Sequence, residues 1–274
     1  MQRGSEILTP SQSTRLARFN LPESVDIHCH CLPDIDDGPQ TMDKSLSLCR
    51  ALVEDGITAV IATPHQLGRY DLGGGRNAAK AVRAGVAALE AALEAAKIPL
   101  AVHAGADVRV DERIPKLLAD DEVLTLADGR RYVLLELPRD IFLDPTRLLR
   151  TLKTRGICGI ISHPERNDFL AARPSRLQGF LQEGALLQVT AGSLCGDFGS
   201  TAERSAWEWV AAGWIDLVAS DAHNLSKRPP RMSRAIDSIA QQLGEATALR
   251  CCVQNPLHVL RGEAVSSPWN RAAP

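Results

Sequence analysis

The 274-residue chain contains no apolar run of about eighteen residues, so it offers no obvious membrane-spanning helix. Its first stretch, Met1 to Pro22, is charged and polar and lacks the apolar segment of an export signal. The seven cysteines are odd in number and show neither a CxxC pair nor disulfide-like spacing, which fits a reducing compartment. We therefore expect a cytoplasmic protein without a membrane span.

Aromatic residues are also scarce, at 4% of the chain, and the formal net charge is only −2. A nucleic-acid partner favours a basic surface and aromatic rings for base stacking, so we expect no such partner. The chain contains neither GxGxxG nor GxxxxGK[ST], the glycine-rich sequences that hold dinucleotides and nucleotide phosphates. These absences argue against a dinucleotide-binding fold.

Short apolar segments alternate with helical ones along the chain. The predicted strands cover residues 25–28, 57–62, 100–104, 132–137, 157–162, 186–189 and 215–219. The predicted helices cover residues 42–54, 77–97, 145–154, 174–183, 201–212 and 230–243. Near-continuous apolar strands separated by helices indicate a parallel sheet with helices on its outer face. Seven such units predict an α/β fold of the (β/α) barrel type, regular or distorted.

The domain organisation follows from the same pattern. We expect a single barrel with a C-terminal tail over residues 24–274, preceded by an N-terminal extension over residues 1–23. Residues 71–77 contain three consecutive glycines, and we expect them to form a mobile loop near the carboxyl ends of the strands.

Side chains that bind metals follow the predicted strands. In barrels of parallel strands the chemistry lies at the carboxyl ends of the strands. Six of the seven strands bring histidine or a carboxylate to that end, which coincidence explains poorly. The candidate ligands are His28, His30, Asp37, His65, Asp107, Glu136, His163, Asp221 and His223.

The spacing of His28 and His30 allows both to bind one ion, because residues two apart on a strand point the same way. Imidazole and carboxylate ligands without a thiolate favour Mn²⁺, Fe²⁺, Co²⁺ or Zn²⁺, and nine candidates are enough for two or three ions. Cys29 and Cys31 should face away from the two histidines. His103, inside a strand, and His258, near the C-terminus, are interpreted as structural.

These residues carry a resemblance to a known family. In their order along the chain they resemble the PHP (polymerase and histidinol phosphatase) superfamily, and within it the bacterial manganese-dependent tyrosine-protein phosphatases of capsule and exopolysaccharide biosynthesis. The resemblance covers about residues 24–262. Its motifs are His28-x-His30, Asp36-Asp37-Gly38-Pro39, Ala62-Thr63-Pro64-His65, His163-Pro164-Glu165-Arg166 and Ser220-Asp221-Ala222-His223-Asn224.

The resemblance implies a distorted (β/α)7 TIM-like barrel, the PHP fold, holding two or three divalent metal ions, with Mn²⁺ expected. It assigns all nine candidates as ligands, with Glu136 bridging, and matches Arg166 and Arg228 to the family's phosphate-contacting arginines. Two departures stand out. Asp107 replaces a glutamate that is common in the family, so this ligand could bind through water or need a shifted strand. The family also usually begins close to the HxH strand, whereas about 23 residues precede it here.

The expected chemistry is in-line attack on phosphotyrosine by a metal-bound hydroxide, while the two arginines hold phosphoryl oxygens. Tyrosine has a pKa of about 10, so its oxygen leaves with little help from an acid. If an acid is used, the candidates are Asp34 and Asp36. Alternatively, Asp36 caps the helix that begins near Met42, or braces a metal ligand. The expected partner is a phosphotyrosine-bearing protein, the tail of a bacterial tyrosine autokinase.

Other functions stay open. The same site could hydrolyse a small phosphomonoester such as histidinol phosphate or a nucleotide, or stabilise a non-catalytic binding barrel. Action on nucleic acid is a further alternative, against which the missing basic surface and the scarce aromatic residues argue. A cysteine phosphatase is excluded, because none of the seven cysteines has arginine six positions later, as Cys-x5-Arg requires.

Overall fold

The structure is a computed structural model that describes residues 23–70, 75–139 and 141–269. Apart from Glu23, the expected N-terminal extension lies outside the described residues, as do the expected loop's residues 71–74 and the last five residues of the chain. None of the described helices has the length and apolarity needed to cross a membrane.

The described strands form two parallel sheets that together close a barrel. One sheet has the order β1-β2-β4 and the other β3-β5-β6-β7-β8-β9, and every pairing is parallel. A parallel bridge between Cys29 and Ala222 joins the end of β1 to the segment after β9. The strands are β1 (Val25–Cys29), β2 (Ala59–Ala62), β3 (His65–Gln66), β4 (Ala101–Ala104), β5 (Asp107–Arg109), β6 (Tyr132–Glu136), β7 (Cys158–Ser162), β8 (Leu186–Thr190) and β9 (Leu217–Ala219).

Two strand positions are interrupted, and this explains why seven predicted strands appear as nine. Thr63-Pro64 separates β2 from β3, and Gly105-Ala106 separates β4 from β5. Proline has no N–H to donate to a ladder. A Cβ on Gly105 would lie 2.6 Å from Cγ2 of Ile61, so only glycine allows this close approach. The predicted seven-stranded parallel barrel is therefore confirmed, with two of its strands broken near their carboxyl ends.

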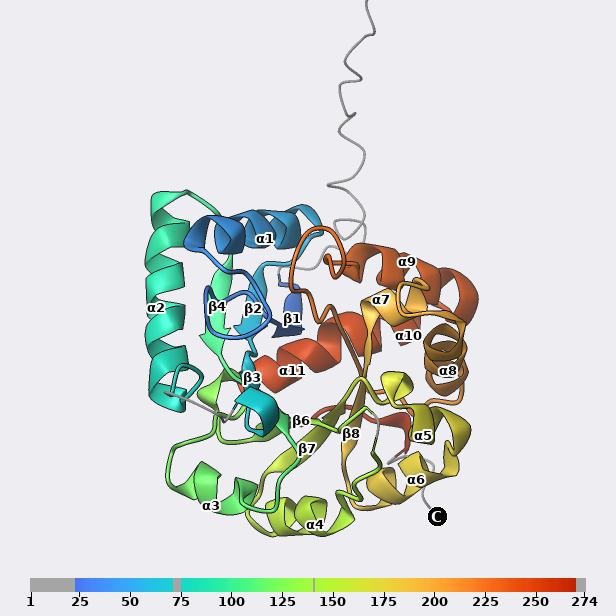
Figure 1. The fold of residues 1–274 in the computed structure, drawn as a ribbon. Coiled ribbons are helices and arrows are strands. Elements are labelled where there is room, and N and C mark those ends of the chain that lie inside the picture. The colour runs from blue at the N-terminus through green and yellow to red at the C-terminus, as the bar shows by residue number, and fades with distance from the viewer. Residues whose placement is uncertain (1–22, 71–74, 140, 270–274) are drawn as a thin grey trace, which may run out of the picture.

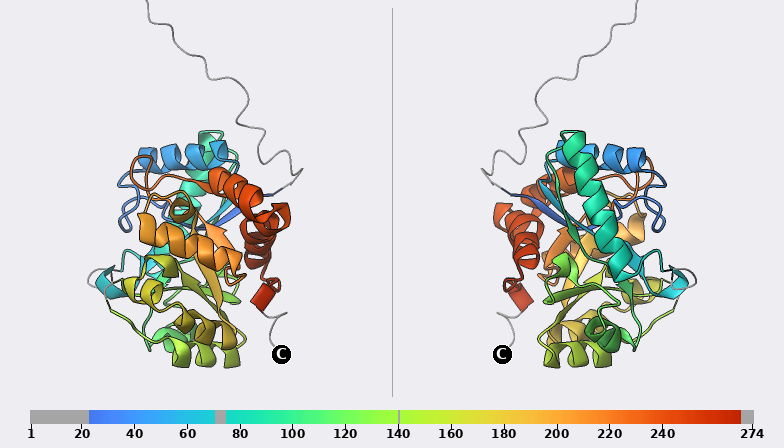
Figure 2. Two further views of the ribbon diagram at one scale, coloured as in Figure 1. Left: turned by 90° about the vertical axis from the view of Figure 1, so that its right-hand side faces the viewer. Right: turned by 90° about the vertical axis from the view of Figure 1, so that its left-hand side faces the viewer.

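Helices surround the barrel, as Figures 1 and 2 show, with α2 on one side and α8 and α9 on the other. All six predicted helices are present, with ends within two residues of the prediction. The sequence pattern missed the short helices and the helix α11. The helices are α1 (Met42–Glu54), α2 (Ala79–Ala95), α3 (Ile114–Ala119), α4 (Thr146–Thr154), α5 (Asp168–Ala172), α6 (Ser175–Gln182), α7 (Ala191–Leu194), α8 (Ser200–Ala211), α9 (Met232–Leu243), α10 (Glu245–Leu249) and α11 (Asn255–Arg261).

The helix α11 closes the amino end of the barrel (Figure 1). Val259 belongs to the apolar cluster inside the barrel, together with Ile27, Leu134 and Ile160, and α11 packs against β1. Just after this helix, the carbonyl of Glu263 accepts a hydrogen bond from the hydroxyl of Tyr132, the first residue of β6. Because α11 covers the amino ends of the strands, the opposite end is left for chemistry.

Candidate metal centre

A β-bulge in β1 brings both histidines of the HxH motif into the barrel. Asp26 pairs with Val60 but Cys29 pairs with Ala62, so β1 has one residue more than β2 over this interval. Ile27 packs inside the barrel, whereas Cys29 packs in the cluster between strands and helices. The bulge therefore turns His28 inward directly after Ile27, and His30 follows on the same side. Cys31 packs in the same outer cluster as Cys29, so both cysteines face away as predicted.

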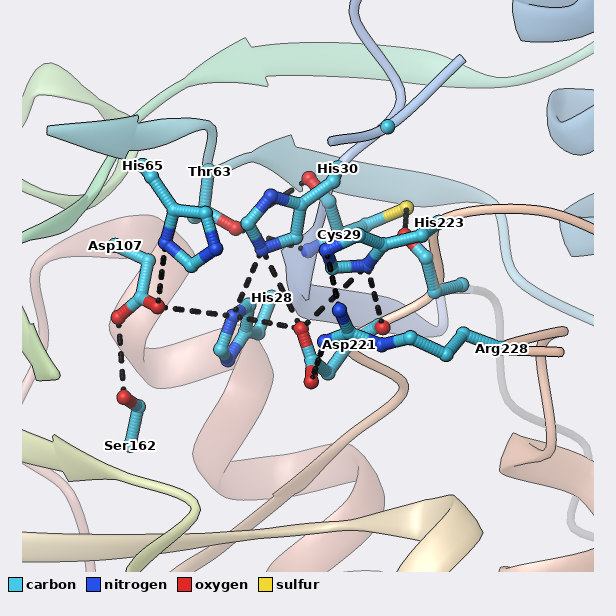
Figure 3. A network of polar contacts seen from close by, with 12 residues as sticks. His28, Cys29, His30, Thr63, His65, Asp107, Ser162, Asp221, His223 and Arg228 are labelled. Atoms are coloured by element: carbon cyan, nitrogen blue, oxygen red, sulfur yellow. Dashed lines mark hydrogen bonds and ion pairs between the residues drawn. The ribbon is translucent and has the colours of Figure 1, made fainter. Parts of the chain in front are cut away.

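Around this strand the first group of predicted ligands converges (Figure 3). The Nε2 atoms of His28 and His30 lie 3.3 Å apart. Oδ1 of Asp221, which follows β9, lies 3.2 Å from Nε2 of His28 and 3.4 Å from Nε2 of His30. All three side chains are buried.

A second group surrounds His65 on β3. Its Nδ1 lies 3.4 Å from Oδ2 of Asp107 and 3.6 Å from Oε2 of Glu136. Its Nε2 lies 3.5 Å from Oδ1 of Asp37, which is in turn 3.3 Å from Nε2 of His223. One imidazole thus faces donors from two other strand ends and the β1–α1 loop.

All nine predicted ligands belong to one continuous set of donors. They form four overlapping groups in which the donor atoms lie within 4.8 Å of one another. The groups are His30, Asp37, His65, His223; His28, His163, Asp221; His28, His30, Asp107; and His65, Asp107, Glu136. His103 and His258 belong to none of these groups.

The donors fit divalent metal ions. In the described part of the chain, Nδ1 of His65, Oδ2 of Asp107 and Oδ1 of Asp221 are buried without a hydrogen-bond partner. Leaving a buried polar atom without a partner costs about 1–3 kcal/mol, and more for a charged group, so one ring nitrogen and two carboxylate oxygens without partners in one cluster call for a cation. The donors are imidazoles and carboxylates without a thiolate, as first-row divalent metals prefer.

The ring nitrogens that point away from the cluster are held by the protein. Nδ1 of His28 lies 2.9 Å from Oε1 of Gln188 on β8, and Nδ1 of His30 lies 2.6 Å from Oδ2 of Asp36. Nδ1 of His223 lies 2.9 Å from the carbonyl oxygen of Asp221. Such contacts fix the tautomer, so that Nε2 keeps its lone pair for a metal.

Asp36 belongs to this bracing layer. Its side chain is buried, Oδ2 accepts from the backbone N–H of His65 as well as contacting His30, and Oδ1 accepts from the backbone N–H of Gly38. The alternative that Asp36 caps α1 is wrong, because the hydroxyl of Thr41 does so. Because both oxygens of Asp36 are engaged inside the protein, we interpret Asp36 as a brace for His30 and not as a proton donor.

Arg166, from the 3-10 helix Pro164–Arg166 that follows β7, and Arg228, from the loop that follows β9, both reach the donor cluster. Nη2 of Arg166 lies 2.8 Å from Oδ2 of Asp221. Arg228 pairs with the same oxygen, and its Nη1 donates to Nε2 of His223 at 2.7 Å. Burial raises the pKa of Asp221, but the two arginines outweigh burial and hold this pKa well below its usual value. Asp221 is therefore ionised at neutral pH.

The pKa values of two histidines favour the neutral form that binds metals. Burial and then the nearby Arg166 hold the pKa of His163 well below its usual value. Burial lowers the pKa of His223 to about 4.

A cavity of about 610 Å³ opens beside the donor cluster. Its wall includes two predicted ligands, both predicted phosphate-binding arginines and a phenylalanine: Glu136, His163, Arg166, Arg228 and Phe198. A phosphoryl group that enters this cavity meets the arginines and the metal donors together.

Comparison with known proteins agrees with this geometry. The family described as "Capsular polysaccharide synthesis, CpsB/CapC" matches residues 24–261. The chain belongs to this family. The chain is also similar to Tyrosine-protein phosphatase YwqE of Bacillus subtilis (strain 168), to which it is 36% identical over 221 residues, covering 80% of this chain and 85% of YwqE. The family resemblance inferred from the motifs is thus confirmed.

Solved structures extend this agreement to the fold of the CpsB/CapC family. One, described as YwqE from Bacillus subtilis and CpsB from Streptococcus pneumoniae, "unique metal-dependent tyrosine phosphatases", has a TM-score of 0.84 and 33% identity over 89% of this chain and 96% of that chain. A mutant organophosphorus hydrolase from Deinococcus radiodurans has a TM-score of 0.52 at 15% identity, over 86% of this chain and 92% of that chain. The second likeness concerns the barrel alone.

Asp107, which stands where the family commonly has glutamate, still reaches the donor cluster. Its Oδ2 lies 3.7 Å from Nε2 of His28 and 3.9 Å from Nε2 of His163, besides its contact with His65. Its other oxygen accepts a hydrogen bond of 3.0 Å from the hydroxyl of Ser162. The break after β4 places Asp107 at the start of β5, paired with His65, so the shorter side chain lies next to the other donors.

The motif analysis missed several residues that contact the donors. Gln188 braces His28, Arg109 pairs with Glu136 at 3.1 Å, and the ring of Tyr70 stacks on His65 with centroids 4.9 Å apart. Only Gln188 has a signal in the sequence, as a polar residue in the centre of the apolar segment LLQVT. The other two residues come close to the cluster only in the folded barrel.

Proposed function

We propose that this protein is a metal-dependent tyrosine-protein phosphatase that acts within a capsular polysaccharide system. The observation that carries the proposal is the convergence of nine metal donors, from six strand ends and one loop, beside a cavity that also holds Arg166 and Arg228. The family, and the tyrosine-phosphatase activity for which its relatives are named, support the choice of phosphotyrosine as substrate.

The nine donors would hold two or three divalent ions, with Mn²⁺ as the metal we propose. When bound, these ions would supply an activated nucleophile from water and neutralise charge on the phosphoryl group. The residues that would hold these ions are His28, His30, Asp37, His65, Asp107, Glu136, His163, Asp221 and His223.

The chain itself binds and orients the substrate. The guanidinium groups of Arg166 and Arg228 are planar and can each donate two hydrogen bonds to phosphoryl oxygens. Both already lie at the edge of the donor cluster through Asp221. Gln188 and Asp36 keep the rings of His28 and His30 in one orientation, so the donors need little rearrangement during the reaction.

A covalent route through cysteine does not fit the geometry. No cysteine lines the cavity within the described residues. Cys29, which lies between the two histidines in sequence, is buried in the outer cluster, and burial raises its pKa to about 11. The protonated thiol is a poor nucleophile.

We further propose that the substrate is the phosphotyrosine-bearing tail of a bacterial tyrosine kinase of the capsule system and that the reaction occurs in the cytoplasm. An ester of tyrosine suits this site, because a leaving group with a pKa of about 10 needs little protonation.

The test is an assay of metal-stripped protein refilled with Mn²⁺, on a phosphotyrosine peptide, a phosphoserine peptide and histidinol phosphate. We expect metal-dependent turnover that is fastest on phosphotyrosine. His30→Ala should abolish turnover, whereas the matched control His258→Ala, outside the donor groups, should leave it intact. Equal or faster turnover of histidinol phosphate would overturn the choice of substrate, and full activity without metal would overturn the mechanism.

A further inference from the structure

Phe198 occupies a specific place in the wall of the cavity. It lies in the loop between α7 and α8, is partly exposed, and lines the cavity together with Arg166 and Arg228. The guanidinium carbon of Arg166 lies 4.6 Å from the centre of the Phe198 ring, a cation–π contact. Among the described residues that line this cavity, Phe198 is the only phenylalanine, tyrosine or tryptophan.

The loop that carries Phe198 is fixed to its surroundings. The backbone N–H of Asp197 donates to the carbonyl of Gly192 at 2.9 Å, and the Asp197 carboxylate accepts from Nε of Arg231 at 2.9 Å. A Cβ on Gly192 would lie 2.9 Å from Cε2 of Phe198. Glycine at position 192 therefore makes room for the ring, and the ring is held in one place before substrate arrives.

The turn that carries Arg166 is tied to the same region. Glu165 is buried, and its Oε1 accepts hydrogen bonds from the backbone N–H of Thr190 at 2.9 Å and the hydroxyl of Ser193 at 2.7 Å. Thr190 and Ser193 lead into the loop of Phe198. Glu165 thus holds Arg166 and Phe198 in a fixed relation to each other.

We infer that Phe198 contacts the aryl ring of phosphotyrosine and is a specificity-determining residue of the enzyme. This inference rests on the proposed function, in which Arg166 and Arg228 bind the phosphoryl group. The aryl ring of phosphotyrosine is joined to phosphorus through a single ester oxygen, so it lies close to whatever binds the phosphoryl group. Phe198 is the ring that both touches Arg166 and faces the cavity. A phosphoserine side chain has no ring to make this contact.

The variant Phe198→Leu keeps an apolar side chain but removes the aromatic ring. An aromatic pair contributes beyond its buried area, so we expect roughly a 3- to 10-fold rise in KM for a phosphotyrosine peptide. Because ring contact persists through the reaction, kcat should change little. The inhibition constant of inorganic phosphate, which has no ring, should stay at the wild-type value. Phe198→Tyr should behave as wild type, and Gly192→Ala, which displaces the ring, should resemble Phe198→Leu.

Phe142→Leu is the matched control. Phe142 stacks on Phe169 with centroids 4.3 Å apart and does not line the cavity, so its loss should change neither constant. Thermal melting and metal content, measured for each variant, identify any that misfold.

Two outcomes would overturn the inference. If Phe198→Leu weakens the binding of inorganic phosphate as much as that of the phosphotyrosine peptide, Phe198 only positions Arg166. If Phe198→Leu changes neither KM nor the inhibition constant, the ring of Phe198 is not in contact with the substrate. Arg166→Lys tests the proposed function separately, because it should weaken the binding of inorganic phosphate and of the phosphotyrosine peptide alike. Wild-type constants in Arg166→Lys would refute the arginine assignment whatever Phe198→Leu shows.

Discussion

Replacing Asp36 by asparagine separates bracing of a ligand from proton donation. The carboxylate of Asp36 serves three groups, namely the ring of His30 at 2.6 Å and the backbone N–H groups of His65 and Gly38 at 3.0 and 2.9 Å. Asparagine has one acceptor oxygen, so at least one of these contacts must be lost. Loss of such an outer contact reduces metal affinity or activity roughly 10- to 100-fold, which corresponds to about 1.4–2.7 kcal/mol.

The assay compares a phosphotyrosine peptide with 4-nitrophenyl phosphate, whose leaving group is more acidic. A brace acts on the metal, so Asp36→Asn should slow both substrates equally, and excess Mn²⁺ should restore much of the rate. Asp34→Asn is the matched control, because Asp34 is exposed and pairs at the surface with Arg76, whose Nη1 lies 3.7 Å from its Oδ1. Normal Mn²⁺ affinity combined with a loss confined to phosphotyrosine would refute bracing and make Asp36 the general acid.

Three further predictions concern stability. Gly38→Ala should destabilise the protein by about 1–3 kcal/mol and weaken Mn²⁺ binding, because the new Cβ would lie 2.5 Å from the carbonyl oxygen of His30. Gly179→Ala is its control, because a Cβ at that position would have no neighbouring atom within 4 Å, and urea titration measures the stability of both variants. Mn²⁺ at about 100 times its Kd should stabilise the wild type by about 2.7 kcal/mol, and an unchanged melting temperature would refute binding to the folded state. Burial raises the pKa of Asp216 from 3.8 to about 6, so between these values the folded protein binds a proton that the unfolded chain releases, and stability should fall as pH rises. The free energy of unfolding should fall by about 3 kcal/mol in total across this range. Asp216→Asn should remove this part of the pH dependence in urea titrations at pH 4, 5, 6 and 7.

The sequence predicted the barrel because its parallel strands are buried on both faces and therefore appear as continuous apolar runs. It also predicted the donor cluster, because the carboxyl ends of parallel strands meet and the position of each candidate relative to its strand could be read directly. The helix α11 was not predicted, because its position depends on contacts with β1, which lies more than two hundred positions earlier in the sequence.

Details of the centre were less predictable because they depend on tertiary contacts. Strict alternation would have placed Ile27 and His28 on opposite faces of β1, and only the bulge seen in the pairing with β2 places both inside. For Asp36 the sequence left proton donation, helix capping and bracing of a ligand open, and the contact with His30 in the folded barrel favours bracing. Phe198 and Arg166 are 32 positions apart in sequence, and no motif links them.

The backbone itself indicates that the fold is adapted to the metal centre. His163 and Asp221 both adopt the left-handed conformation, with φ of 34° and 51°, which costs a non-glycine residue roughly 1–3 kcal/mol. His163 directly follows β7, and Asp221 lies two residues after the end of β9, where the chain leaves the barrel while these side chains still join the donor cluster. In Asp221 this conformation accompanies a backbone hydrogen bond of 2.8 Å to the carbonyl of His28. The bond closes the barrel between the first and last strand positions and brings the carboxylate of Asp221 next to the ring of His28. Closure of the barrel and assembly of the donor cluster therefore depend on the same contact, so binding of metal to this cluster should stabilise the closed barrel.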